Sequence, residues 1–374
     1  MTEREAYIVL NRIEGLGPVT VRRLVETLGS ASAILEADAG ELKEAPKVGP
    51  KLADAIIRQR RDIDVAQELE ATETIGARII TLIDDEYPQA LSAIYDPPLA
   101  LYIWGELLPE DGKSLAIVGS RSATNYGIGA ADRFGFQLAQ LGFTVVSGMA
   151  RGIDTAAHRG ALKAKGRTIA VLGGALDCLY PPENAALAEQ IAASGAVISE
   201  YPLGRQADRQ TFPYRNRIIS GMTMGALVVE CGRKSGTLHT ADAALEQGKT
   251  VFAIPGRIDS PSSKGANHLI KNGACLVDSV DDILHEFDLF EPYGQQELSL
   301  TAARPDVPMS GEEQQLVEAL WQGSLDVDSL SRVSGLPIQR VSSLLIGLEL
   351  KRVVRMLPGR YAELRDDLIN LKME

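Results

Sequence analysis

Apolar positions follow two different patterns along the chain. Residues 1–70 carry apolar side chains at helical spacing, as in IEGLGPVTVRRLVETLG at 13–29 and APKVGPKLADAIIRQR at 45–60. From about residue 78 the pattern changes to short continuous apolar runs that alternate with helical stretches. Continuous runs rich in Val and Ile are typical of strands that are buried on both faces of a sheet. The sequence therefore predicts a helical module followed by an α/β domain.

The apolar runs that we interpret as strands are separated by segments long enough to form helical crossovers. This alternation predicts a Rossmann-like doubly wound parallel sheet. The runs are RIITLI at 78–83, LAIVGS at 115–120, FTVVSG at 143–148, TIAVLGG at 168–174, AVISE at 196–200, ALVVE at 226–230, TVFAIPG at 250–256 and ACLV at 274–277.

The C-terminal part has a different pattern. Residues 290–309 combine Pro, Gly and polar residues without periodicity, which is typical of a linker. Residues 310–374 predict three short helices, the third at 337–352, and then two strands joined at Pro358–Gly359, which is the outline of a winged helix. The expected domains are a helical helix-hairpin-helix-like (SAM-like) module at 1–75, a Rossmann-like domain at 76–290, a linker at 291–309 and a winged helix at 310–374.

The helical module contains two turns, GLG at 15–17 and VGP at 48–50, that resemble helix-hairpin-helix turns. Such a turn points backbone N–H groups at a nucleic-acid phosphate, and the following helix adds its dipole. The same glycines also suit tight turns in a packed helical module. Residues 1–70 carry 13 acidic and 10 basic side chains. Both interpretations stay open, and we favour the structural one.

Composition limits the classes of function. The chain of 374 residues has 38 Lys and Arg against 50 Asp and Glu, a net charge of −12. This balance argues against a protein that coats nucleic acid with its whole surface, but it allows a local basic groove. No secretory signal and no apolar run near the roughly 20 residues of a bilayer span occur. Cys178, Cys231 and Cys275 are far apart, which argues against a disulfide framework or a zinc motif. We expect a cytoplasmic protein without a metal.

Four loops after predicted strands combine small residues with Arg or Lys where a helix should begin. Small residues let a phosphate approach the backbone, helix N-termini supply N–H donors, and guanidinium groups offer two parallel hydrogen bonds. Because the carboxyl ends of parallel strands meet at one edge, we expect an elongated anion-binding groove there. The loops are GSRSATNYGIGA at 119–130, SGMARGIDTAAHRGAL at 147–162, FPYRNRIISG at 212–221 and ECGRKSGTLHTADAAL at 230–245.

The common nucleotide-binding motifs do not fit these loops. The first loop reads GSRSATNYG rather than G-x-G-x-x-G, and Arg121 occupies the space that a pyrophosphate fingerprint keeps small. The pattern G-x-x-x-x-G-K-[ST] does not occur in the sequence. We therefore expect neither a nicotinamide cofactor nor an ATP site, and no cofactor is predicted.

For several single residues the sequence allows either a functional or a structural role. Asp154 and His158 lie four apart on a predicted helix and would suit a carboxylate–imidazole dyad, but no Ser or Cys nucleophile is tied to them, so we favour structural roles and predict no catalytic residue. His239 has the same status. Glu230 is either a ligand contact or a cap. Phe212 either stacks on a base or anchors the core.

Six motifs in one order carry a resemblance to a known family. They are SGMARGIDTAAHRGAL, LGGALDCLYPPEN, ISEYPLG, FPYRNRIISG, SGTLHTADAA and VFAIPG. Over about residues 80–280 the chain closely resembles the DprA/Smf family, the DNA-processing proteins of bacterial transformation. The resemblance implies a protein that binds single-stranded DNA, protects incoming strands and helps load RecA onto them. It also implies a homodimer formed through the Rossmann domain. Members of the family are not known as enzymes, so the resemblance implies no enzymatic activity.

The resemblance implies a set of DNA-binding positions as well. We expect Arg121, Arg217 and Lys234 to share one trough, with Arg233 able to take the part of Lys234. The implied positions are Gly119, Ser120 and Arg121 in the first loop, Ser147, Gly148, Arg151 and Gly152 in the second, Arg215, Asn216 and Arg217 in the third, and Arg233, Lys234, Ser235 and Gly236 in the fourth. Phe212 joins them as the candidate for base stacking.

Two other classes of function stay open. The SGT-helix-Glu pattern at 235–246 is faintly similar to the loops of phosphoribohydrolases, with Glu246 or Glu230 as the acid. The second class is a protein-binding adaptor in which the helical ends of the chain matter more than the groove. The acidic balance of residues 310–374, with 10 acidic and 8 basic side chains, favours protein contacts by the winged helix at least as much as DNA contacts.

Overall fold

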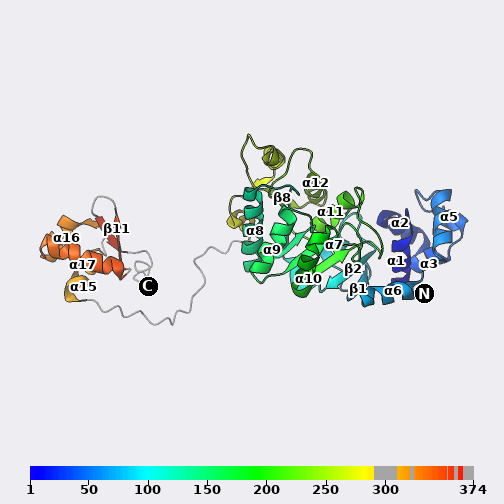
Figure 1. Ribbon diagram of the computed structural model, residues 1–374, viewed down its shortest axis with the longest axis horizontal. Coiled ribbons are helices and arrows are strands. Elements are labelled where there is room, and N and C mark those ends of the chain that lie inside the picture. The colour runs from blue at the N-terminus through cyan, green and yellow to red at the C-terminus, as the bar shows by residue number, and fades with distance from the viewer. Residues whose placement is uncertain (290–309, 321–323, 352, 358–360, 365–374) are drawn as a thin grey trace. The chain divides into compact units, whose positions relative to one another are not determined.

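The computed structural model describes residues 1–289, 310–320, 324–351, 353–357 and 361–364. The chain divides into two compact units, Met1–Phe290 and Glu291–Glu374, whose elements are labelled in Figure 1. The predicted linker at 291–309 lies outside the described residues.

The first unit begins with a helical module. Helices α2 and α5 start alike, each with a glycine cap, Gly17 or Gly49, followed by proline at the first helical position, where the missing N–H costs no hydrogen bond. Leu24 and Ile56 of these two helices share one apolar core. The helices are α1 (Glu3–Arg12), α2 (Pro18–Leu28), α3 (Ala31–Glu36), α4 (Ala39–Leu42), α5 (Pro50–Gln59) and α6 (Val65–Thr74).

A nine-stranded sheet forms the centre of the first unit, in the order β1-β2-β6-β5-β4-β3-β7-β8-β9. All neighbours from β6 to β9 in this order pair in parallel, which confirms the predicted Rossmann-like sheet. The strands are β1 (Ala77–Thr81), β2 (Ala100–Gly105), β3 (Ser114–Val118), β4 (Thr144–Ser147), β5 (Thr168–Val171), β6 (Ala196–Ser199), β7 (Gly225–Val228), β8 (Thr250–Ala253) and β9 (Cys275–Leu276).

Strand β2 is a difference from the sequence interpretation, which did not include the run ALYIWG at 100–105. It pairs antiparallel with β1, joining Ala77 to Trp104, and antiparallel with β6, joining Tyr102 to Ser199. Its side chains are buried because α1 and α10 (Ala185–Ser194) cover it, as the core that Ile8 shares with Tyr102 shows. The helical module and the sheet therefore share one apolar core.

Helices cover both faces of the sheet, as Figure 1 shows. Leu115 and Ile117 of β3 face one layer, and Ala116 and Val118 face the other, because successive side chains of a strand alternate. One layer contains α8 (Asn125–Gln140), α9 (Ile153–Lys163), α10 (Ala185–Ser194) and α14 (Val280–Glu286). The other contains α7 (Gln89–Ser92), α11 (Thr211–Gly221), α12 (Leu238–Glu246) and α13 (Lys264–Lys271). Three short turns are η1 (Pro109–Gly112), η2 (Pro182–Asn184) and η3 (Pro261–Ser263).

The second unit has the predicted winged-helix outline. The third predicted helix is α17 (Ile338–Leu350), and the two strands after it, β11 and β12, pair antiparallel. Strand β10 pairs with β12 and completes a sheet of order β10-β12-β11. Its core includes Leu316, Leu330 and Leu345. The turn predicted at Pro358–Gly359 lies outside the described residues. The elements are α15 (Gly311–Leu320), β10 (Leu325–Asp326), α16 (Val327–Ser334), α17 (Ile338–Leu350), β11 (Val354–Leu357) and β12 (Tyr361–Leu364).

The described residues contain neither a membrane-spanning helix nor a metal-binding cluster. None of the helices there is both long and apolar enough to cross a membrane. The same residues contain no group of His, Cys, Asp or Glu placed to hold a metal ion. All three cysteines are free thiols.

Candidate nucleic-acid interface

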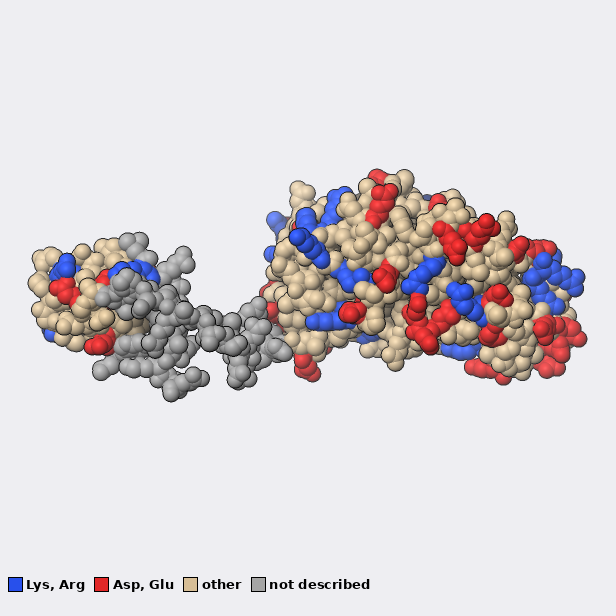
Figure 2. All heavy atoms as spheres, turned by 90° about the horizontal axis from the view of Figure 1, so that it is seen from below, with Lys and Arg blue, Asp and Glu red and all other residues tan. Residues whose placement is uncertain are grey.

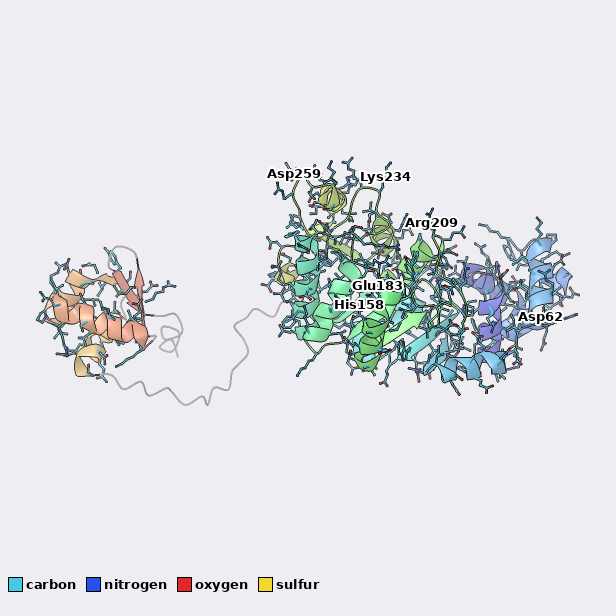
Figure 3. The ribbon with its side chains drawn as sticks, in the orientation of Figure 1. Asp62, His158, Glu183, Arg209, Lys234 and Asp259 are labelled. Carbon is cyan, nitrogen blue, oxygen red and sulfur yellow. The ribbon has the colours of Figure 1, made fainter. Side chains whose placement is uncertain are left out.

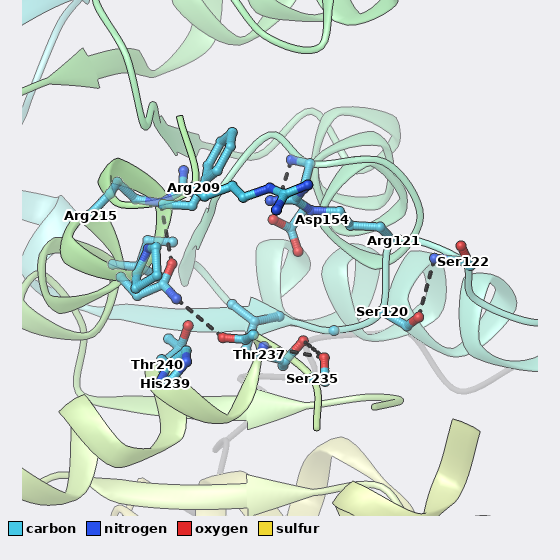
Figure 4. Close-up of a pocket in the computed structure, with 18 residues that line it drawn as sticks. Ser120, Arg121, Ser122, Asp154, Arg209, Arg215, Ser235, Thr237, His239 and Thr240 are labelled. Atoms are coloured by element: carbon cyan, nitrogen blue, oxygen red, sulfur yellow. Dashed lines mark hydrogen bonds between the residues drawn. The ribbon is translucent and has the colours of Figure 1, made fainter. Parts of the chain in front are cut away.

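A pocket of about 460 Å³ opens at the carboxyl edge of the sheet, and all four predicted loops contribute to it. We call it the carboxyl-edge pocket (Figure 4). Of the predicted positions, those that line it are Gly119, Ser120, Arg121, Phe212, Arg215, Asn216, Ser235 and Gly236. The pocket therefore joins segments that are more than 100 residues apart in sequence, as expected where parallel strands end.

Two exposed arginines, Arg121 and Arg209, stand on one wall of the pocket (Figure 4). The guanidinium carbon of Arg121 lies 4.6 Å from the centre of the Phe212 ring, which holds the side chain over the pocket. Within the described residues neither arginine forms an ion pair. Both guanidinium groups are therefore available to an anion.

The sequence interpretation missed Arg209. It lies in the loop that leads into α11, where no apolar periodicity marks an element. Its position three residues before Phe212 could have indicated a role in binding. Residues just before a helix at the carboxyl edge of the sheet lie next to the N-terminus of that helix. Thr237, His239 and Thr240 also line the pocket without having been predicted to bind.

The opposite wall is the turn that leads into α12 (Figure 4). The Ser235 hydroxyl donates a hydrogen bond to Thr237 Oγ1 (2.9 Å), and the Thr237 N–H donates to Ser235 Oγ (3.3 Å). The Asn216 amide donates to the Gly236 carbonyl (3.4 Å), which ties this turn to α11. The N–H groups of Leu238, His239 and Thr240 donate to carbonyls of this turn, so the wall contributes the positive end of the α12 dipole and not free N–H donors.

Arg215 and Asp154 form the buried floor of the pocket. Arg215 donates to the carbonyls of Gly148 (2.8 Å) and Val171, and Asp154 accepts from the Ala150 N–H (3.3 Å). Burial raises the pKa of Asp154 to about 6, although the charge of Arg215 lowers it, and burial lowers the pKa of Arg215 to about 10. The floor therefore holds a cation whose charge Asp154 balances only when it is ionised.

Two glycines of the second loop are required by this packing, although neither lines the pocket. A Cβ on Gly148 would lie 2.5 Å from the Arg215 guanidinium. Gly152 has φ +76°, and a Cβ there would lie 2.3 Å from the Ser120 carbonyl oxygen. These two glycines therefore position Arg215 and the first loop, while Ala150 and Asp154 are the residues of the second loop that line the pocket.

Arg217 requires a correction, because it does not reach the pocket. It is buried, forms an ion pair with Glu200, and places its Nε 3.2 Å from Asp96 Oδ2. Its guanidinium also lies 4.1 Å from the centre of the Tyr214 ring. Residues two apart on a helix point about 200° apart, so Arg215 and Arg217 face different sides of α11. Arg217 is thus a buried partner of carboxylates that lies outside the carboxyl-edge pocket.

The expected trough of Arg121, Arg217 and Lys234 is therefore not what the structure shows. Lys234 is exposed on the loop after β7, but it does not line the carboxyl-edge pocket (Figure 3). Arg233 of the same loop lines a separate hollow beside Lys264. The arginines that the structure brings together are Arg121, Arg209 and Arg215.

Two further predicted positions take other roles. Ser147 is buried, and its hydroxyl donates to the Ile117 carbonyl (2.6 Å), which ties β4 to β3. Arg151 is exposed next to the pocket and forms an ion pair with Glu183. Neither residue lines the pocket.

The structural interpretation holds for His158. Its Nδ1 lies 2.7 Å from Thr168 Oγ1, and the Thr168 hydroxyl donates to the Val145 carbonyl (2.7 Å), so the imidazole Nδ1 is the donor. Burial lowers the pKa of His158 to about 3, which keeps the ring neutral. The imidazole is hydrogen-bonded to Thr168 and not to Asp154, so the two residues do not form a dyad.

The acids proposed for a phosphoribohydrolase also lie outside the pocket. Glu230 accepts hydrogen bonds from the Thr124 N–H (2.8 Å), the Thr124 hydroxyl (3.1 Å) and the Ser262 hydroxyl (2.6 Å), so it fixes the start of α8. Glu246 is exposed at the far end of α12 from the pocket. The carboxylate that does line the pocket is Asp154.

Comparison with known proteins identifies the family. The family model of DNA recombination-mediator protein A matches residues 78–288, more than half of the chain and every loop of the pocket. The chain belongs to the DprA/Smf family. Two flanking matches, a SAM-like helix-hairpin-helix tandem at 7–62 and a DprA winged helix domain at 301–360, agree with the modules at the two ends.

Individual DprA/Smf proteins support this assignment along the whole chain. Protein Smf of Synechocystis sp. is 34% identical over 392 residues, which cover 96% of this chain and 98% of that protein. DNA processing protein DprA of Bacillus subtilis is 41% identical over 58% of this chain and 74% of its own.

Two solved DprA structures are also similar. The X-ray structure of DprA from Streptococcus pneumoniae has a TM-score of 0.67 and 34% identity, and covers 76% of this chain and 99% of that one. DprA from Helicobacter pylori has a TM-score of 0.51 and 29% identity over 56% of this chain and 95% of that one, and is described for its mode of binding single-stranded DNA.

Proposed function

We propose that this DprA/Smf protein binds single-stranded DNA in the cytoplasm, protects incoming strands and helps load RecA onto them, in natural transformation or recombination. The observation that carries the DNA-binding part is the carboxyl-edge pocket, where Arg121 and Arg209 face the N-terminus of α12 without an ion-pair partner in the described residues. The likeness to a relative that binds single-stranded DNA supports the choice of ligand.

The pocket would hold the strand by its phosphates. Guanidinium groups and the positive end of a helix dipole suit phosphate oxygens, and such contacts give affinity without choosing a sequence. The Phe212 ring beneath Arg121 offers an apolar surface for a base. A duplex keeps its bases paired inside the helix, so it cannot use this surface, and we expect a preference for single strands. Binding of this kind needs no cofactor.

A binding titration of single-stranded and duplex oligonucleotides at two salt concentrations tests this proposal. We expect tighter single-strand binding that weakens with salt, with a slope near −0.7 for each phosphate neutralised. Arg121→Ala and Arg209→Ala should each weaken binding and flatten the slope. Arg133→Ala, which removes an exposed arginine in the middle of α8 outside the pocket, is the matched control. Unchanged slopes in both pocket variants would contradict the proposal.

Loading of RecA is supported by family membership. It can be measured as the lag before RecA hydrolyses ATP on a strand coated with single-strand-binding protein. We expect this chain to shorten the lag and the Arg121→Ala/Arg209→Ala variant to lose that effect. A lag that the wild-type chain leaves unchanged would reject a loading role while leaving DNA binding intact.

We also propose a homodimer formed through the Rossmann domain. In the described sheet β9 pairs with β8 and leaves its other edge open. Leu276 of this strand is 49% exposed, and Ile258 nearby in the same hollow is 91% exposed. An open strand edge with exposed apolar side chains is suited to pair with a second copy. Leu276→Glu should yield monomers in sedimentation, and a wild-type chain that sediments as a monomer would overturn the proposal.

A further inference from the structure

Planar side chains form a row that leads out of the carboxyl-edge pocket. Arg121 lies over Phe212 at 4.6 Å, the Phe212 and Tyr180 ring centres are 5.8 Å apart at an angle of 52°, and the Arg151 guanidinium lies 5.8 Å from the centre of Tyr180. We call these four residues the aromatic row. Arg121 and Phe212 line the pocket, whereas Tyr180 and Arg151 lie beyond it.

Three loops at the carboxyl edge place the row. Phe212 comes from α11, Tyr180 from the loop after β5, and Arg151 from the turn before α9. Gly173 allows the contact with Phe212, because a Cβ there would lie 2.7 Å from the ring. Glu183 holds the guanidinium of Arg151 beside the Tyr180 ring through an ion pair. The row is therefore fixed by the fold on both sides of Tyr180.

Tyr180 differs from the tyrosines that serve the core. Tyr102 is fully buried and donates to Glu68 (2.7 Å), and Tyr87 is buried and donates to the Pro98 carbonyl (2.9 Å). Tyr180 is 43% exposed although it touches Phe212 at the mouth of the pocket. Core packing does not account for a ring held at this place with so much of its surface in water.

We propose that Tyr180, with Arg151 beside it, is a second base-stacking position for the strand whose phosphate the carboxyl-edge pocket holds. This inference rests on the proposed function and extends it, because it gives the strand a path from the pocket across Phe212 and Tyr180. Aromatic rings and guanidinium planes both stack with unpaired bases of any sequence. The protein would then bind a longer strand better than the nucleotide in the pocket alone.

Oligonucleotide length separates this position from the pocket. We would measure the affinity of the full chain for a thymidine dinucleotide and for a strand of about ten thymidines. Tyr180→Ala should weaken binding of the longer strand about tenfold and leave the dinucleotide affinity and the salt slope unchanged, because it removes a stacking surface and no charge. Tyr180→Phe should bind as the wild type does. Arg121→Ala should weaken the binding of both oligonucleotides.

A second pair of matching geometry supplies the control. Tyr95 is 66% exposed and carries the Arg22 guanidinium 4.9 Å from its ring centre, but it does not line the pocket. Tyr95→Ala should leave both affinities unchanged. A strand with 2-aminopurine at successive positions should show one base whose fluorescence is quenched by the wild type and not by Tyr180→Ala.

Two results would overturn the inference. One is a Tyr180→Ala chain that binds the longer strand as the wild type does. The other is an equal loss for both lengths, which would mean that the ring supports the pocket and not a second base. A wild-type chain that binds neither ligand would instead reject the proposed function, so the two failures are distinguishable.

Discussion

The carboxyl-edge pocket and the winged helix both carry arginines, but they use them differently. In the pocket, Arg121 and Arg209 are exposed and have no ion-pair partner in the described residues. In the described part of the winged helix, Arg340 pairs with Glu312 (2.6 Å), Lys351 with Glu313 (2.9 Å) and Arg355 with Glu363 (2.5 Å). Arg332 there forms no ion pair and donates to the Asp328 carbonyl (3.4 Å) and the Ser329 hydroxyl (3.1 Å).

The surface of α17 continues this difference. In many winged helices the third helix enters a DNA groove. Here its exposed positions include Gln339, Ser343, Ile346 and Glu349, and Ile346 is 60% exposed. An apolar side chain beside an acid suits a protein surface better than a phosphate backbone.

The number of basic residues in a region is therefore a poor guide to DNA binding. Affinity for a polyanion comes from cations that release counterions, and a cation already paired with a carboxylate contributes little. Figure 2 shows basic and acidic side chains interspersed over one face of the protein, so the place of the unpaired arginines matters more than the net charge.

The largest expected effect is the loss of both free arginines of the pocket. Arg121→Ala/Arg209→Ala should weaken single-strand binding by about 4 kcal/mol, or roughly 1,000-fold, because in the proposed complex each guanidinium makes a charge-assisted hydrogen bond to a phosphate. Fluorescence anisotropy at low salt measures this. Arg340→Ala/Arg355→Ala is the matched control from the winged helix. An equal loss in the control variant would remove the distinction between the two regions.

The next effect separates a phosphate-binding arginine from a structural one. Arg217→Ala should lower the free energy of unfolding by about 3 kcal/mol, because it leaves Glu200 buried without its partner. Urea unfolding measures this value. The salt slope of DNA binding by the folded variant should stay at the wild-type value. An Arg217→Ala variant that is as stable as the wild type but has a flatter salt slope of DNA binding would show that Arg217 contacts DNA.

A smaller effect comes from the pH dependence of the floor. The pKa of Asp154 is about 6, so Asp154 takes up a proton as the pH falls from about 7 to about 5 and stops opposing the charges of Arg121 and Arg215. DNA binding should therefore strengthen about three- to tenfold over this range. His158 stays neutral throughout and does not contribute.

Asp154→Asn is the variant that tests this pH effect. It should bind at neutral pH as tightly as the wild type binds at the acidic end, with a flat profile. The wild type and the Asp154→Asn variant are best compared with His239→Gln present in each, because the exposed His239 side chain also lines the pocket. A wild-type profile that is flat, or that Asp154→Asn leaves unchanged, speaks against a charged floor.

The smallest effect is expected on α17. Ile346→Ser should change single-strand affinity by less than about twofold, because no phosphate contact is lost. Anisotropy under the same conditions checks this. A tenfold loss would show that the winged helix takes part in DNA binding.

Much of the fold and part of the site could be predicted from the sequence. Seven of the eight apolar runs form parallel strands, whereas the run at 78–83 forms β1, which pairs antiparallel with β2. The rule that parallel strands end at one edge placed Gly119–Arg121 next to Ser235–Gly236. The run at β2 was missed although four of its residues are buried. The different places of Arg215 and Arg217 could have been predicted from the sequence. If FPYRNRIISG is a helix, residues two apart point about 200° apart, so only one of the two arginines can face the pocket.

Other features could not be predicted from the sequence. Arg209 and Tyr180 lie in irregular loops, where no periodicity fixes a direction, and their places depend on contacts with residues from other loops. The difference between a free and a paired arginine depends on partners such as Glu200 for Arg217, which only the folded chain brings together.

The most direct test of the central claim compares the full chain with a chain of residues 1–290 for binding to a single strand of about ten nucleotides, at about 50 and 200 mM salt. If the carboxyl-edge pocket is the DNA site, both chains should show the same salt slope and affinities within about twofold. A chain of residues 1–290 that loses most of its affinity, while residues 310–374 alone bind the strand, would contradict the account.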